Sequence, residues 1–232
     1  MSMRPGGLID VPDVDAELAE AAGLDARDAP SPPVRGARLD AGPWPLDDEP
    51  LGFGLLVVSG LLLRRVELVD RHSGELLGPT DIVRPNEPDS DQHSMVPSFA
   101  TWRALTPVQF AVLDHRFAQW AGAHAAVLDT LLGRLVRRSR SLAFRLALVQ
   151  MPRTSARLHF LFWHLADRYG TVGRNGVMLT LPLTQGDLAE LVSTQRQSVS
   201  DALGELEEAG TVERVPRRGW LLKGSPQTFP EV

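Results

Sequence analysis

The hydrophobic positions near the C-terminus fall into two short helical faces with a tight turn between them. Apolar residues spaced by three or four line one face of a helix. The two sets are Leu188 with Val192, and Val199 with Leu203 and Leu206. Only Ser193 and Thr194 separate the two helical segments, which leaves room for a turn and nothing longer. Residues 183–210 are therefore predicted to form a helix-turn-helix.

The limits of the second helix follow from its flanking residues. Thr194 has the hydroxyl that an N-cap needs, and Gln197 stands three residues later, which predicts a capping box. Gly210 supplies a C-terminal stop, so the second helix is expected from about Gln195 to Ala209.

Polar side chains on the outer face of the second helix are candidate DNA contacts, because the N-terminal residues of such a helix meet base edges in the major groove. Arginine can bind guanine, and glutamine can bind adenine, through two hydrogen bonds. An ordinary helical hairpin with solvated polar residues is the alternative. The candidates in the hairpin are Thr184, Gln185, Thr194, Gln195, Arg196, Gln197, Ser198, Ser200 and Asp201.

A two-stranded wing is expected after the hairpin. Residues 211–215 and 220–222 are rich in β-formers, and residues 216–219, Pro-Arg-Arg-Gly, form a turn between them. Residues 176–181 can pair as a third strand. Arg217 and Arg218 at the wing tip are expected to contact phosphate, although a turn also carries arginines for solubility alone.

A heptad pattern of apolar residues runs through residues 123–150 and predicts a long dimerisation helix. The seam consists of Leu128, Leu132, Leu135, Ser139, Leu142, Leu146 and Val149. Ser139 is its one polar position and is expected to set the register. The alternative is a core helix of a single subunit, because Leu131, Val136 and Phe144 lie off the seam and are expected to pack against other parts.

The segment after this helix is expected to hold the domain boundary. Pro152 ends one helix or starts the next, so residues 151–154 are the expected hinge. A helix over residues 154–169 follows, with Leu158, Leu161, Phe162 and Leu165 as its apolar face. Residues 170–176 read as a loop. The expected C-terminal domain is 151–232.

Short strands and turns characterise the front of the chain. Residues 1–40 are expected to be loosely ordered, with a short helix at 14–22, and residues 41–122 to form a small β-barrel or jelly roll. The fold class is therefore α+β. The expected strands are 51–60, 61–69, 76–78 and 99–104, residues 106–117 lead into a helix, and residues 85–91 form a polar loop.

Composition and charge narrow the function. The chain has 232 residues and no cysteine, which excludes disulfides, thiolate zinc sites and cysteine-held iron–sulfur clusters. Residues 1–130 hold 10 basic and 20 acidic residues, whereas residues 131–232 hold 14 and 9. This asymmetry fits an acidic front domain and a back domain that faces DNA. The N-terminus lacks the apolar core of a signal peptide, and Leu51–Leu63 is too short to span a bilayer, so a cytoplasmic protein without a membrane partner is expected.

No catalytic or metal-binding cluster stands out. His72, His93, His115 and His124 are scattered, and none forms the His-x-His plus carboxylate cluster that a cupin-type metal site needs. Neither a Gly-x-Ser-x-Gly nor a phosphate-loop motif occurs. The chain is therefore not expected to be an enzyme, and no cofactor is predicted.

The order of these elements resembles the CRP/FNR family of transcription regulators. The similarity spans about residues 40–225 and is strongest at LTQGDLAELVSTQRQSVSDALGELEEAG, with further matches at Arg157-Leu158 and at GLLVVSGLLLRR. The resemblance implies a homodimeric, sequence-specific regulator controlled through its barrel. Its implied partners are double-stranded DNA, a second copy of the chain and RNA polymerase.

The chain departs from the family's cyclic-nucleotide cassette. Pro79 replaces the ribose-binding glutamate after Leu77-Gly78, and Ser98 replaces the phosphate-binding arginine before Phe99-Ala100. Without that arginine, a buried cyclic phosphate would lack a counter-charge. Leu142 and Ala143 stand where binders have hydroxyl residues. Cyclic AMP is therefore not expected to be the effector, which stays unknown.

The recognition helix departs from the family as well, because Gln197 replaces the usual glutamate and Asp201 replaces a second arginine. The operator is thus expected to differ from the family's usual sequence. Two other functions stay open: a haem or gas sensor that uses a histidine such as His72 as axial ligand, and a barrel enzyme with a DNA-binding tail.

Overall fold

The computed structural model describes residues 4–9, 34–44, 52–69, 71–85, 98–216 and 219–227. The chain divides into two compact units. The first comprises Met1–Arg71 and Glu75–Ser141, and the second comprises His72–Gly74 and Leu142–Val232. The division falls within the long helix α4 (Ala125–Val149), not at residues 151–154 where the sequence placed the boundary.

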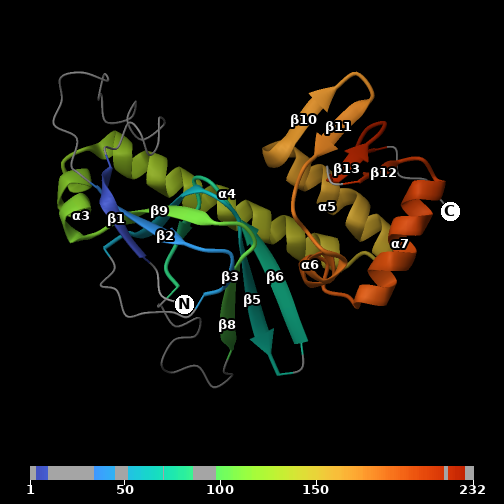
Figure 1. Cartoon of the computed structure of the whole chain (residues 1–232), viewed down its shortest axis with the longest axis horizontal. Coiled ribbons are helices and arrows are strands. Elements are labelled where there is room, and N and C mark those ends of the chain that lie inside the picture. Colours follow the sequence, from blue (N-terminus) through green and yellow to red (C-terminus); the bar gives the residue numbers. More distant parts are fainter. Residues whose placement is uncertain are drawn as a thin grey trace. The chain divides into compact units, whose positions relative to one another are not determined.

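The first unit is built on two antiparallel sheets (Figure 1). The five-stranded sheet has the order β1 (Arg4–Ile9), β2 (Val34–Leu39), β9 (Val108–Leu113), β4 (Gly54–Ser59) and β7 (Ile82–Val83). The four-stranded sheet has the order β3 (Gly42–Pro43), β8 (Phe99–Ala104), β5 (Leu62–Leu68) and β6 (Arg71–Leu77). These jelly-roll sheets confirm the expected α+β class. The described strands form two sheets, and no closed barrel is formed among them.

Both faces of the five-stranded sheet are buried. On one face, Phe110 of β9 packs in a shared core with Trp102 of the other sheet and with Trp44. On the other face, Ala111 and Leu113 join a second cluster that includes residues of α3 (His115–Gly122) and the start of α4. This double burial makes β9 the central element of the unit.

Residues 106–117 lead into a helix as expected, because α3 begins at His115, but strand β9 occupies residues 108–113 and was not anticipated. A strand buried on both faces shows no apolar–polar alternation, and the sequence pattern therefore could not identify it. Residues 1–40 were expected to be loose, yet β1 and β2 lie within them and pair with each other and with β9. The helix expected at 14–22 and most of the polar loop at 85–91 lie outside the described residues.

The second unit contains three helices and a small sheet. Helix α5 (Thr154–Tyr169) has the predicted bounds, and its predicted apolar face is buried. Helices α6 (Gln185–Leu191) and α7 (Arg196–Glu208) pack against each other and α7 packs against α5. The sheet has the order β10 (Gly170–Gly173), β11 (Gly176–Leu179), β13 (Gly219–Leu222) and β12 (Val212–Val215). The wing and its third strand are thereby confirmed.

Residues 170–176 were expected to be a loop, and that expectation is wrong. They form strand β10 and a short turn into β11, with Val172 opposite Val177. Three glycines in seven residues favoured a loop, but pairing with β11 satisfies the backbone of this segment. None of the described helices is long and apolar enough to cross a membrane.

Candidate DNA-binding surface

Helix α6 begins with a capping box that the sequence analysis missed. Thr184 Oγ1 accepts a hydrogen bond from the Asp187 N–H at 3.2 Å, and the Thr184 N–H donates to Asp187 Oδ2 at 2.7 Å. The two bonds satisfy backbone donors that the first turn of a helix leaves open. Asp187 is 3% exposed, so the carboxylate that caps the first turn of α6 is buried in the second unit. The Thr-x-x-Asp spacing of residues 184–187 could have predicted this capping box.

The turn between α6 and α7 differs from the prediction in one respect. Ser193 adopts a positive φ of 53°, and the Thr194 N–H donates to the Ala189 carbonyl at 2.9 Å. Thr194 thus belongs to the turn, and Gln195 is the N-cap of α7, without a side-chain capping bond. The capping box predicted at Thr194 and Gln197 is therefore wrong. Because α7 starts at Arg196, the side chains of Gln195, Arg196 and Gln197 stand at its N-terminal end.

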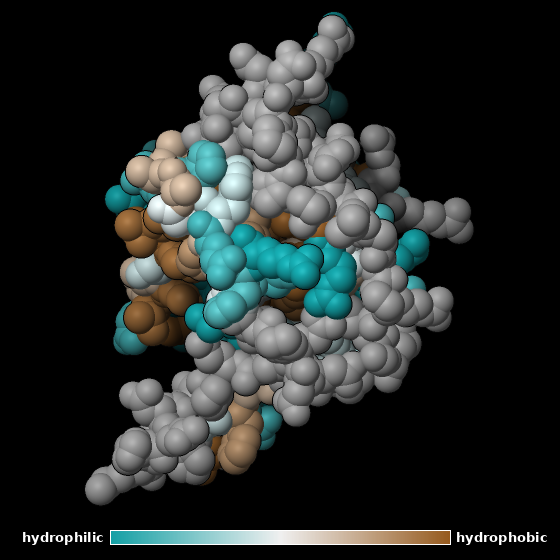
Figure 2. Space-filling model, turned by 90° about the vertical axis from the view of Figure 1, so that its left-hand side faces the viewer, coloured by the Kyte–Doolittle hydropathy of each residue, from teal (hydrophilic) through white to brown (hydrophobic). Residues whose placement is uncertain are grey.

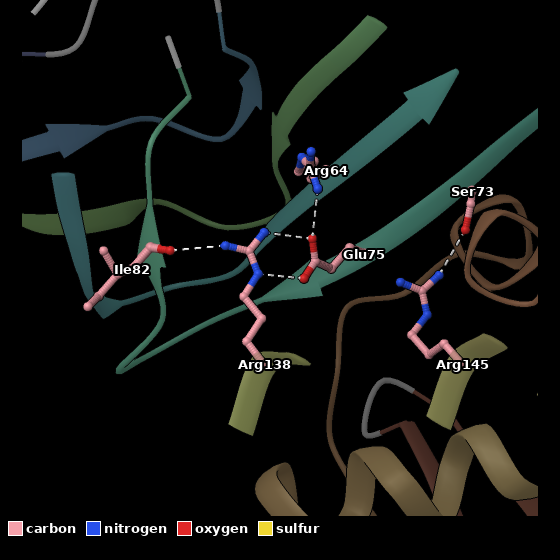
Figure 3. Close-up of polar contacts among 6 residues, drawn as sticks. All are labelled: Arg64, Ser73, Glu75, Ile82, Arg138 and Arg145. Atoms are coloured by element: carbon pink, nitrogen blue, oxygen red, sulfur yellow. Dashed lines mark hydrogen bonds and ion pairs between the residues drawn. The ribbon is translucent and has the colours of Figure 1, made fainter. Parts of the chain in front are cut away.

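Two arginines hold the C-terminal end of α6. Arg157 of α5 donates through Nη1 to the Val192 carbonyl at 3.3 Å and through Nε to the Met151 carbonyl at 2.7 Å. Arg145 of α4 donates through Nη2 to the Leu191 carbonyl at 3.3 Å and to Ser73 Oγ at 3.2 Å (Figure 3). Cations suit this end of a helix, where carbonyls lack partners. The sequence analysis quoted Arg157 only within the family resemblance and gave Arg145 no role.

The apolar face of the helix-turn-helix is confirmed, and its polar candidates lie on the outside. Leu188, Val192 and Val199 are fully buried, and Leu203 and Leu206 nearly so. Among the candidates, Thr184, Gln195, Arg196, Gln197 and Asp201 are exposed, while Gln185, Thr194, Ser198 and Ser200 are half-buried. All of them lie at the start of α6, in the turn, or in the first two turns of α7.

One polar contact on α7 was not anticipated. The Gln197 side-chain amide donates to Asp201 Oδ1 at 3.0 Å, one helical turn further on. The pair orients both side chains on the exposed face. Arg196 stands beside it and makes no hydrogen bond or ion pair to any described residue. Arg217 and Arg218, expected at the wing tip, lie outside the described residues. In the sequence they stand between Val215, the last residue of β12, and Gly219, the first residue of β13, and these two residues pair.

One family model matches the part of the chain that contains these helices. Residues 156–223 match the family model of the Crp-like helix-turn-helix domain. These residues form a Crp-like helix-turn-helix domain. The match begins within α5 and continues through α6, α7 and the wing, and it confirms the resemblance inferred from LTQGDLAELVSTQRQSVSDALGELEEAG.

Solved structures extend the similarity to most of the chain. A cyclic nucleotide-binding domain protein from Listeria monocytogenes superposes with a TM-score of 0.64 at 18% identity, over 81% of this chain and 88% of that one. FixK2 from Bradyrhizobium japonicum gives 0.62 at 18%, over 82% and 92%. A CRP-family transcriptional regulator from Thermus thermophilus gives 0.56 at 23%, over 80% and 91%.

These likenesses establish the fold. The chain has the CRP/FNR fold, with jelly-roll sheets, a long helix and a C-terminal winged helix-turn-helix in that order. Two of the matching structures, both from Thermus thermophilus, are described as transcriptional regulators, one of the CRP family and one of the CRP/FNR family. No protein of curated function matches the chain in sequence.

The first unit contains a cavity of about 530 Å³. Pro79 and Ser98, the positions compared above with the family's cyclic-nucleotide cassette, do not line it. Pro79 lies in the turn after β6, where the Gly78 N–H donates to Asp81 Oδ2 at 2.8 Å, and Ser98 directly precedes β8. Neither is among the described residues that line the cavity, whereas Arg64, Arg84 and Arg138 are. No bound ligand tests the expectation that a buried cyclic phosphate would lack a counter-charge, so it stays a prediction.

Proposed function

We propose that the protein is a sequence-specific DNA-binding regulator of transcription that acts as a homodimer and through RNA polymerase. The observation that carries this proposal is the exposed Gln195-Arg196-Gln197 run at the start of α7, the second helix of a Crp-like helix-turn-helix domain. In such domains the N-terminal residues of this helix reach base edges in the major groove.

The side chains on α7 offer a specific pattern for base recognition. Arg196 presents a guanidinium that suits guanine O6 and N7, and Gln195 presents an amide that suits adenine. Asp201, oriented by Gln197, presents a carboxylate that accepts from the cytosine amine. Arg217 and Arg218 of the wing are proposed to contact phosphate, which positions the domain without selecting a sequence.

The exposed seam of α4 supports the homodimer. Leu132 and Leu146 are 59% and 68% exposed, and Leu128, Leu135 and Leu142 are exposed as well. Leu131 and Leu148 are 4% and 2% exposed, so these off-seam residues belong to the chain's own core. Val136, also expected to pack, is exposed instead. Figure 2, seen from the side of the molecule that carries α3, shows hydrophobic side chains, in brown, gathered at the left-hand edge of the described surface.

A row of exposed leucines at heptad spacing along one helix is expected to be buried against another surface. A second copy of α4 in parallel provides one, since the same seam then faces itself across a twofold axis. Both recognition helices would then meet DNA in half-sites about 34 Å apart, centre to centre.

The experiment that tests this function is selection of binding sites from random DNA with the full-length protein. The expected product is an inverted repeat with half-sites about one helical turn apart. Enrichment of a single half-site would contradict the dimeric mode of binding. Failure to enrich any sequence would overturn the assignment of α7 as the recognition helix.

The effector is proposed not to be cyclic AMP. Its ribose hydroxyl and adenine amine are hydrogen-bond donors, and none of the described side chains that line the cavity is an acceptor. Leu142 and Ala143 are exposed and apolar, so their side chains offer no hydrogen bond to a base. Calorimetry is expected to show no binding of cyclic AMP or cyclic GMP at micromolar ligand, and a saturating isotherm would contradict the proposal. A Soret band in the purified protein would favour the haem-sensing alternative instead.

A further inference from the structure

A groove of about 670 Å³ lies within the second unit, between the first turn of α5 and the outer face of α7. The two helices pack against each other (Figure 1). A volume of this size lies within the range of sites that hold small organic ligands. The groove is separate from the cavity of the first unit and shares no lining residue with it.

Three carboxylates of α7 line one wall of this groove. Asp201, Glu205 and Glu208 follow one another at spacings of four and three residues, so they share one face of the helix. Successive carboxylates are therefore about 6 Å and about 4.5 Å apart along the helix axis. All three side chains are exposed, and neither Glu205 nor Glu208 forms a hydrogen bond or ion pair through its side chain with a described residue. The wall is thus a row of negative charges.

The floor of the groove is apolar. Ala202 and Leu206 line it and are 3% and 1% exposed. Each follows a carboxylate residue of α7 directly in the sequence, so the apolar side chains run parallel to the row of carboxylates. An aliphatic chain can pack on this floor while charged groups along the chain face the carboxylates.

Ser155 supplies a buried hydroxyl on the opposite wall. It lies in the first turn of α5, lines the groove and is 6% exposed. Its hydroxyl forms no hydrogen bond with any described residue. Buried polar side chains are nearly always hydrogen-bonded in folded proteins, so this hydroxyl indicates a missing partner within the groove.

The arrangement does not suit a single metal ion. A metal site needs several ligands that converge on one point. The three carboxylates are instead distributed along about two turns of α7. Among the described residues, no group of three or more His, Asp and Glu side chains is placed to hold a metal ion. An elongated cation with separated charges matches the row of carboxylates better than a compact ion does.

Arg153 gives one end of the groove the opposite charge. It is the one basic residue among the described residues that line the groove, and it precedes the first turn of α5, whose N–H groups no side chain caps. Such an end attracts an anion. Ser198 and Asp201, two of the proposed DNA contacts, line the same groove, so the anion expected there is a DNA phosphate. The carboxylates of α7 repel this phosphate.

We propose that the groove binds a linear aliphatic polyamine. The ammonium groups face the carboxylates of α7, the methylene groups pack on Ala202 and Leu206, and the Ser155 hydroxyl accepts a hydrogen bond from one ammonium group. Ammonium groups that are joined by three or four methylenes are about as far apart as successive carboxylates of the row. The bound polyamine neutralises the carboxylates where a DNA phosphate approaches Arg153. Polyamine binding itself does not depend on DNA, whereas its effect on DNA affinity rests on the proposed function.

Calorimetry on the full-length protein in the absence of DNA tests the site with two cations of equal charge. Spermidine is the extended trivalent probe, and hexaamminecobalt(III) is the compact trivalent control. We expect saturable binding of spermidine at submillimolar concentration in about 0.1 M salt. The compact ion is expected to bind at least about tenfold more weakly, because it reaches fewer carboxylates and cannot cover the apolar floor. Equal affinities, or no binding of spermidine at about 1 mM, would overturn the proposal.

Three variants locate the site. Glu205→Gln removes one exposed charge and is expected to weaken spermidine about threefold to fivefold. Ser155→Ala removes the unpaired hydroxyl and is expected to weaken it about tenfold. Glu207→Gln is the matched control, because Glu207 is exposed on the same helix and does not line the groove. Its glutamine retains an acceptor for the Arg214 N–H, which Glu207 Oε1 binds at 3.2 Å.

The control decides between a site and the overall charge of α7. Equal losses of spermidine affinity in Glu205→Gln and Glu207→Gln would show that only the overall charge matters and would overturn the proposal. Unchanged affinity in a folded Ser155→Ala would overturn it as well. If Ser155→Ala fails to fold, the comparison of Glu205→Gln with Glu207→Gln decides alone.

A DNA titration separates this site from the proposed function. Saturating spermidine is expected to raise the affinity of the wild-type protein for its selected DNA site more than that of Glu205→Gln/Glu208→Gln, in which two of the repelling charges are already removed. The ratio between the two proteins is measured because spermidine also neutralises the DNA. An equal change in both would contradict the effect on DNA. Failure of the DNA selection with intact spermidine binding would overturn the proposed function alone, and loss of calorimetric binding would overturn the polyamine site alone.

Discussion

Arg138 of the long helix and Glu75 of strand β6 form a two-point ion pair, 63 residues apart in the chain. The side chains are 22% and 9% exposed, so the pair is largely removed from water. Arg138 also donates to the Ile82 carbonyl at the start of β7, and Arg64 of β5 shares the same carboxylate. One carboxylate thus ties α4 to three strands of the first unit.

Arg138→Met is expected to destabilise the first unit by about 3 kcal/mol, because it leaves the buried Glu75 carboxylate with fewer partners. The double variant Arg138→Met/Glu75→Leu should be more stable than Arg138→Met alone, since it removes the uncompensated charge as well. Urea unfolding followed by far-UV circular dichroism measures both. Arg140→Met, at an exposed position on the same helix, is the control and should change little. A double variant no more stable than the single one would contradict the account of the pair.

The second unit is expected to lose stability as the pH falls from about 7 to about 5. Burial lowers the pKa of His159 and of His164 below the ordinary 6.5. The unfolded chain therefore takes up protons before the folded chain does, and the free energy of unfolding declines below pH 6.5. His164→Gln should reduce this pH slope, because it removes one of the two imidazoles with a lowered pKa. In the folded chain His164 stacks on Phe144, with 4.3 Å between the ring centroids. Thermal unfolding in a pH series measures the effect, and an unchanged slope in the variant would refute it.

Leu135→Asp is expected to convert the dimer to a monomer. Two carboxylates would face each other in the seam, at a cost of several kcal/mol. Sedimentation at micromolar concentration measures the oligomeric state. Val136→Asp is the matched control, because Val136 is exposed on the same helix but lies off the seam. If Leu135→Asp stays dimeric, or if both variants dissociate equally, the interface is elsewhere.

Arg196→Ala is expected to cost about 1–3 kcal/mol per half-site and to relax the preference at one base position. Arg217→Ala should weaken binding to all DNA alike and reduce the salt slope by about one unit for each phosphate that the side chain no longer neutralises. Titration of matched and scrambled DNA at two salt concentrations distinguishes the two. The same sequence-independent loss of affinity in both variants would show that α7 does not recognise bases.

Asp201→Ala is expected to raise affinity for non-specific DNA and to remove a preference for cytosine. The carboxylate repels phosphate unless it accepts from a base amine, and the variant also releases Gln197 from its bond to Asp201. Asp201→Asn, which retains the size and an acceptor oxygen, should raise non-specific affinity while it keeps Gln197 in place. The same DNA titrations measure both variants, and unchanged base preference in Asp201→Ala would argue against a reading role.

The sequence by itself determined the elements whose periodicity is local. The apolar spacing predicted both ends of α5 correctly, and it predicted the two helices of the helix-turn-helix and both strands of the wing. Each of these elements buries one face and exposes the other, which gives a periodic pattern in the sequence. It also determined which side chains lie outside on α7. The start of α7 was less secure, because Thr194 offers a capping hydroxyl in the sequence but belongs to the turn at Ser193, which leaves Gln195 as the N-cap.

Only the tertiary structure decided the features that depend on distant partners. Strand β9 has no alternation because α3 and α4 cover one of its faces and the second sheet covers the other. β1 and β2 are strands because β9 offers them an edge with which to pair. Likewise, Arg64, Trp102 and Arg138 meet at one cavity although they lie on three different elements. The spacing of apolar residues reveals the buried face of a helix or strand. It does not show which residues of another segment will come within hydrogen-bonding distance.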